Sequence, residues 1–143
     1  MTLTMESTSA ERIIEIREKQ RKYFHSGATL DVKARKAALK KFEQAVLKWE
    51  KPLCDALWAD LHKSYEEAYL TEISILLGEI RTHIRKIGKW TRPQRKCTPL
   101  KLFPSSSRIV SEPLGTALII SPWNYPVQLL LTPLVGAISA GCT

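Results

Sequence analysis

The sequence predicts an α/β protein, and three features of the chain support this prediction. Amphipathic helical patterns fill most of residues 8–92. The nearly all-apolar run over residues 116–120 is typical of a strand buried on both faces, as parallel strands are. Residues 126–140 have no polar face, which predicts a helix buried in a large core or in a membrane. The loop between this strand and this helix lies where α/β proteins bind ligands.

Four helices are expected in the N-terminal part. The first follows the capping box Thr8-Ser9-Ala10-Glu11, in which a hydroxyl and a carboxylate can satisfy backbone N–H groups at the helix start. The second is expected over residues 31–49, and Pro52 suits the first turn of a third. The fourth is long: it begins at a second capping box, residues 64–67, and ends before Pro93.

Residues 98–115 have a different character from these helices. Several prolines and a run of serines interrupt any helical pattern there. Within this segment residues 108–111 predict a short strand, and residues 112–115 predict a turn. The expected buried strand at residues 116–120 comes next, and as a parallel strand it requires a neighbouring strand.

The charges are confined to the first part of the chain. The formal net charge is +8, and residues 113–143 contain no Asp, Glu, Lys or Arg. Residues 80–111 carry many Lys and Arg and no acid, a pattern that could attract phosphate or nucleic acid. Because this stripe lacks interleaved aromatics and any known reading motif, we expect a solvated or partner-covered basic face and no nucleic-acid binding.

The cysteines and the N-terminus indicate a cytoplasmic protein. Cys54, Cys97 and Cys142 are widely spaced and odd in number, and no histidine stands at metal-ligand spacing. We therefore expect reduced thiols, with no disulfide framework and no metal site. Residues 1–12 contain no apolar core of signal-peptide length.

The loop and its flanks resemble the aldehyde dehydrogenase superfamily. Ser121-Pro122-Trp123-Asn124-Tyr125-Pro126 looks like the PWN(Y/F)P loop of that family. The turn at residues 112–115 and the helix at residues 133–141 are similar to the family segments before and after the loop. Residues 60–73 and 89–104 resemble the class 3-like branch in particular.

This resemblance implies an incomplete aldehyde dehydrogenase fold, with N-terminal helices and the first strand, loop and helix of a Rossmann-like cofactor domain. Residues 1–97 would form the helical part of the cofactor-binding domain. Residues 98–115 would begin the dimerisation arm, and residues 116–143 would form the truncated strand-loop-helix. One departure is Cys142, where the family commonly has asparagine.

By the same resemblance, the chain is the N-terminal part of an NAD- or NADP-dependent enzyme that oxidises aldehydes to carboxylic acids. In the family a cysteine thiolate attacks the aldehyde, hydride passes to the cofactor, and a glutamate activates the water that releases the acid. The nucleophile, the general base and the cofactor lysine lie beyond Thr143 in the family, and no cysteine of this chain resembles the nucleophile. We therefore expect the 143-residue chain alone to be inactive, and the full-length form to be a homodimer.

The resemblance also assigns roles to single residues. Asn124 matches the asparagine whose fixed amide stabilises the oxyanion, although the residue pattern alone also allows it to cap the helix that begins at Pro126. Tyr125 resembles an aromatic wall of the substrate tunnel, with plain packing as the alternative. The loop backbone that lines nicotinamide and ribose in the family corresponds to Ile120, Ser121, Pro122 and Trp123.

Two other interpretations remain open. The uncharged residues 113–143 are long enough to span a bilayer, and the basic stripe fits a cytoplasmic flank, as in a membrane-attached helical protein. Against this, prolines interrupt the segment, and Ser121 and Asn124 would lie at mid-bilayer. The other alternative is a non-catalytic remnant that binds intact subunits.

Overall fold

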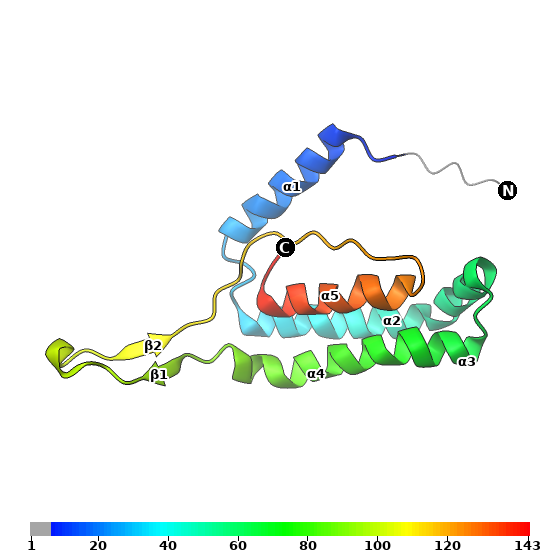
Figure 1. Ribbon diagram of the computed structural model, residues 1–143. Coiled ribbons are helices and arrows are strands. Elements are labelled where there is room, and N and C mark those ends of the chain that lie inside the picture. Colours follow the sequence, from blue (N-terminus) through cyan, green and yellow to red (C-terminus); the bar gives the residue numbers. More distant parts are fainter. Residues whose placement is uncertain (1–6) are drawn as a thin grey trace.

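The structure, a computed structural model, describes residues 7–143 and is built around a layer of long helices (Figure 1). α2 (Val32–Leu61), α4 (Ser74–Trp90) and α5 (Pro126–Ala140) lie side by side and pack against one another. The core of this layer consists of Leu39, Val46, Cys54, Leu57, Ala68, Ile73, Leu76, Leu77, Ile80 and Val135. Because α5 packs on α2 and α4, the end of the sequence is held against its N-terminal half.

Truncating a core leucine of α4 should destabilise the helical layer. Leu76 is 0% exposed, so we expect Leu76→Ala to lower the free energy of unfolding by about 2–5 kcal/mol through lost burial and a residual cavity. Leu70→Ala is the matched control because Leu70 is 65% exposed. Urea denaturation of the two variants checks this, and an equal loss in both would contradict the assignment of the core.

The first helix, α1 (Ala10–His25), is capped one residue later than the sequence pattern predicts. Its N-cap is Ser9 and not Thr8: the Ser9 hydroxyl oxygen accepts a hydrogen bond from the backbone N–H of Arg12 at 3.3 Å. Ser9 has the extended backbone of an N-cap, which leaves Thr8 outside the capping geometry. No side chain of α1 is buried among the described residues, and α1 leans away from the helical layer in Figure 1.

The second and third predicted helices are one continuous helix, so the predicted break at Pro52 is wrong. Proline in a helix interior removes one backbone hydrogen bond and is usually disruptive. Here Val46 precedes Pro52 and Leu57 follows it, and both side chains are buried in the same core. Burial on both sides of the proline offsets the lost hydrogen bond and keeps α2 continuous.

The long predicted helix over residues 64–90 is present, with an interruption that the sequence did not indicate. Ser64 caps α3 (Tyr65–Ala68) by accepting from the Glu67 N–H at 3.2 Å, as the capping box predicts. The chain then forms the π-helical turn η1 (Tyr69–Ile73) before α4 begins. Such turns are rare inside α-helices and often occur at functional sites. This turn carries the buried residue Glu72.

A small hairpin extends beyond α4. β1 (Gln94–Lys96) pairs antiparallel with β2 (Ser107–Ile109), and the short helix η2 (Leu100–Leu102) lies in the connection. The strand predicted at residues 108–111 is therefore present but shifted toward the N-terminus. β1 was not predicted because its sequence, Gln-Arg-Lys, lacks the β-branched and aromatic residues that favour strands.

The strand predicted at residues 116–120 is absent, which corrects that prediction. A ladder requires a neighbouring strand, and among the described residues only the last one, Thr143, forms backbone hydrogen bonds with this segment. The Thr143 N–H donates to the Gly115 carbonyl at 3.0 Å, and the Ala117 N–H donates to the Thr143 carbonyl at 2.8 Å. Thr143 thus forms one hydrogen bond with each residue that flanks Thr116, which is the bonding pattern of parallel strands.

The predicted helix over residues 126–140 is confirmed as α5, with Pro126 in its first turn. Gly141 ends the helix at φ +89°, a backbone conformation that favours glycine, and a Cβ there would lie 3.0 Å from the Thr29 carbonyl oxygen. Within residues 7–143, no helix has both the length and the apolar character needed to cross a membrane.

Candidate functional site

The buried carboxylate of Glu72 lies at the start of α5. Its Oε2 accepts hydrogen bonds from the backbone N–H groups of Val127 at 2.8 Å and Gln128 at 3.2 Å. The first N–H groups of a helix have no partner within the helix, and the helix dipole favours a negative charge at that end. By accepting these two hydrogen bonds, Glu72 acts as the cap of α5, although it belongs to η1. Its side chain is 0% exposed.

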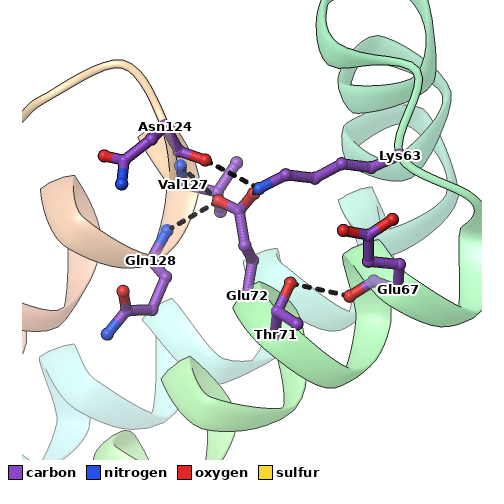
Figure 2. A network of polar contacts seen from close by, with 7 residues as sticks. All are labelled: Lys63, Glu67, Thr71, Glu72, Asn124, Val127 and Gln128. Carbon is purple, nitrogen blue, oxygen red and sulfur yellow. Dashed lines mark hydrogen bonds and ion pairs between the residues drawn. The ribbon is translucent and has the colours of Figure 1, made fainter.

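Lys63 completes this buried network (Figure 2). Its ammonium Nζ lies 2.6 Å from Oε1 of Glu72 and donates to the backbone carbonyl of Asn124 at 2.8 Å. The same ammonium lies 3.8 Å from the centre of the Tyr125 ring, which is a cation–π contact. Lys63 is only 8% exposed, so its charge is neutralised by Glu72 and not by water. The Lys63–Glu72 pair therefore holds both Asn124 and the start of α5.

Asn124 presents its side chain away from this pair. Figure 2 shows the amide of Asn124 pointing away from Lys63 and Glu72, and the residue is exposed. Within residues 7–143 this amide forms no hydrogen bond. The alternative role as helix cap is not observed, since Tyr125 occupies the N-cap position of α5 and the N–H groups of Val127 and Gln128 donate to Glu72. The amide of Asn124 is thus available to a ligand at the surface of the loop.

The other site residues predicted from the sequence lie on the same loop. Ile120 is 85% exposed and Trp123 is 83% exposed, Pro122 is exposed, and Ser121 and Tyr125 are half-buried. The structure therefore brings all of them together at the N-terminal end of α5. What they share is one contiguous segment, residues 120–125, that includes Asn124 and leads into α5.

Lys63 and Glu72 were missed by the sequence analysis, although Glu72 left a signal. Glu72, Leu76 and Ile80 recur at helical spacing, so one carboxylate stands on a face that is otherwise apolar. A charged residue on a core-facing stripe is buried almost only when it is paired. Lys63, directly before the cap Ser64, carries no comparable signal.

The cysteines do not form part of this site. Burial, with a smaller effect of the Glu50 charge, raises the pKa of the Cys54 thiol and disfavours its nucleophilic thiolate form. Cys97 is exposed in the hairpin region, and Cys142 follows α5.

Alkylation of the native chain should distinguish these thiols. We expect iodoacetamide to modify exposed Cys97 first and to leave Cys54 unmodified until a denaturant is added, because only an accessible thiolate reacts. Peptide mass spectrometry of time points identifies the sites. Fast labelling of Cys54 in the native chain would contradict its burial.

Comparisons with known proteins agree in indicating one family. The profile of the aldehyde dehydrogenase family matches residues 1–143. Aldehyde dehydrogenase family 3 member F1 of Arabidopsis thaliana is 38% identical over 139 residues, which cover 97% of this chain and 28% of that protein. The dimeric NADP-preferring aldehyde dehydrogenase of Canis lupus familiaris is 37% identical over 134 residues, which cover 91% of this chain and 29% of that protein.

A solved structure supports the same relationship. The substrate-bound state of Staphylococcus aureus AldH matches with a TM-score of 0.86 and 44% identity, over 91% of this chain and 29% of that one. The chain thus spans 28–29% of the length of these three proteins.

Proposed function

Since the chain belongs to the aldehyde dehydrogenase family, on its class 3-like branch, we propose that it forms the N-terminal part of an NAD(P)-dependent enzyme. The enzyme oxidises aldehydes to carboxylic acids. The observation that carries this proposal is the exposed, unbonded amide of Asn124 on a loop whose backbone is held by a buried ion pair. The thiolate nucleophile and the base that activates water come from the rest of the enzyme.

Asn124 stabilises the negative charge that develops on the former carbonyl oxygen. Its amide donates a hydrogen bond without carrying a charge, so it is ready at any pH. A donor that is fixed in place before the charge appears costs no reorganisation during the reaction. The contact of Lys63 with the Asn124 carbonyl supports this role because it leaves the side chain pointing outward.

The residues present fit the nicotinamide end of the cofactor. Ile120 and Trp123 offer exposed apolar surface for a flat ring, next to Ser121 and Pro122. The N–H groups at the start of α5 are bound by the Glu72 carboxylate, so they offer no site for the cofactor phosphates. When bound, NAD or NADP supplies the acceptor for hydride. The name of the canine relative supports NADP as one of the two.

The remaining parts of the chain fit the same proposal. Tyr125 forms an aromatic wall for the aldehyde substrate, with its ring held under Lys63. Residues 1–97 belong to the cofactor-binding domain, residues 98–115 begin the dimerisation arm, and residues 116–143 begin a Rossmann-like sheet. The name of the canine relative supports a homodimer, and the enzyme acts in the cytoplasm.

A chimera tests this function directly. Residues 1–143 are joined to the part of Staphylococcus aureus AldH that follows the matched segment, and this protein is here called the AldH chimera. We expect it to reduce NAD or NADP in the presence of an aldehyde, followed by the absorbance of the reduced nicotinamide. A folded chimera without this activity, beside active parental AldH, would contradict the proposal.

The 143-residue chain alone should be inactive in the same assay. In the proposed enzyme the nucleophile and the base come from the rest of the protein, so we expect none of the three cysteines of this chain to support turnover. The same concentration of the AldH chimera is the positive control. Turnover by the purified chain alone, abolished by alkylating its own cysteines, would show that the chain contains a nucleophile.

A further inference from the structure

We propose that the Lys63–Glu72 pair is a positioning device for Asn124 in aldehyde oxidation, an inference that rests on the proposed function. Both side chains are buried, so the proposed role is indirect. They act through the backbone of the loop and set where the amide of Asn124 points.

The contacts of the pair fix the carbonyl of Asn124 and the chain that directly follows it. Lys63 binds the carbonyl of Asn124 itself at 2.8 Å, and Glu72 binds the N–H groups of Val127 and Gln128 just beyond it. The Tyr125 ring between these points lies against the Lys63 ammonium. Asn124 thus leads into α5 through a backbone that is fixed at its own carbonyl and at the first turn of the helix, and its side chain points away from Lys63 and Glu72 (Figure 2).

The loop has few other restraints. Ala117 is bound to Thr143, and Tyr125 accepts the first bond within α5. Between them, among the described residues, the Asn124 carbonyl is the backbone group that is hydrogen-bonded to the helical layer. Exposed side chains such as Ile120 and Trp123 add little packing. Without Lys63, no backbone hydrogen bond to the helical layer would hold the described segment between Ala117 and Tyr125.

Stability alone is a weak reason for a buried ion pair. Replacing such a pair by apolar residues of similar volume is often neutral or stabilising, because burying two charges is costly. What the pair adds here is directed hydrogen bonds to chosen backbone atoms, which an apolar pair cannot make. A double variant, Lys63→Met with Glu72→Leu, therefore separates positioning from folding.

Hydrogen exchange on the 143-residue chain gives the first test. In the double variant we expect the peptide around residues 124–129 to exchange about 10-fold faster or more, with the core of α4 unchanged. If α4 also exchanges faster, Lys63→Gln replaces the double variant, since it keeps the Glu72 carboxylate that caps α5 and removes the ammonium that binds the Asn124 carbonyl, Glu72 and the Tyr125 ring. Unchanged exchange around residues 124–129 in a folded variant would overturn the proposal.

Kinetics of the AldH chimera give the second test. The double variant should lower kcat about 10²-fold, because a small misplacement of a catalytic group has effects of this size. In an Asn124→Ala background the same double variant should change kcat by about 2-fold or less, since the positioned group is already gone. Lys63→Arg should retain more activity than Lys63→Met.

The two proposals fail in different ways. An equal loss of kcat with and without Asn124 would make the pair merely structural and overturn the inference. If Asn124→Ala alone leaves kcat unchanged, the proposed role of Asn124 fails, and with it any positioning in catalysis. Hydrogen exchange would still decide whether the pair tethers the loop.

Discussion

Asn124→Ala in the AldH chimera is expected to lower kcat for aldehyde oxidation by about 10²–10³-fold, the usual cost of removing one oxyanion donor. The alanine side chain cannot donate to the oxygen that becomes negative, so the barrier rises while the ground-state contacts of the aldehyde remain. We therefore expect KM for the aldehyde to change much less than kcat. Steady-state kinetics over a range of aldehyde concentrations measures both constants.

Gln128→Ala is the matched control for this substitution. It also removes a primary amide near the start of α5, but the contact of Gln128 with Glu72 uses its backbone N–H, which alanine keeps. We expect kcat to stay close to that of the unmodified chimera. Equal losses in the two variants, or no loss with Asn124→Ala, would remove the basis for an oxyanion role.

Glu72→Ala is expected to have the largest effect on stability. It leaves the Lys63 ammonium buried without its counter-charge and the first N–H groups of α5 without an acceptor. Breaking a buried pair from one side costs about 3–5 kcal/mol. Urea denaturation of the 143-residue chain measures the loss.

The control for this second substitution is Glu66→Ala on the neighbouring helix turn. Glu66 is exposed, so its removal should change the free energy of unfolding by no more than about 0.5 kcal/mol. The double variant Lys63→Met with Glu72→Leu should recover much of what Glu72→Ala loses, because no unpaired charge stays buried. A double variant as unstable as Glu72→Ala would show that the hydrogen bonds, and not the charges, dominate.

Local sequence signals predicted the helices well where one residue determines the boundary. Ser64 caps its helix as the pattern requires, and Pro126 opens α5. The errors lie where packing overrides the local signal. Pro52 lies inside α2 because buried residues on both sides belong to one core. Residues 116–120 have the apolar sequence of a strand, but the described residues supply only Thr143 as a backbone hydrogen-bonding partner.

The sequence pointed to only part of the candidate site, because local patterns do not report contacts between distant parts of the chain. The resemblance of the loop assigned roles to Asn124 and its neighbours through a short contiguous motif, and these roles stay predictions. Lys63 and Glu72 reach the loop from a distant part of the chain, and no local pattern reports such a contact. The π-helical turn that carries Glu72 has no sequence signature of its own. Only the folded chain shows that the carboxylate meets the start of α5.

The most direct test of the account is a crystal structure of the AldH chimera with an aldehyde bound covalently to its nucleophilic cysteine. We expect the amide nitrogen of Asn124 to lie about 2.7–3.1 Å from the former carbonyl oxygen. Lys63 should still donate to the Asn124 backbone carbonyl, as it does in this structure. An oxygen held only by other donors, with the Asn124 amide turned away, would contradict the account.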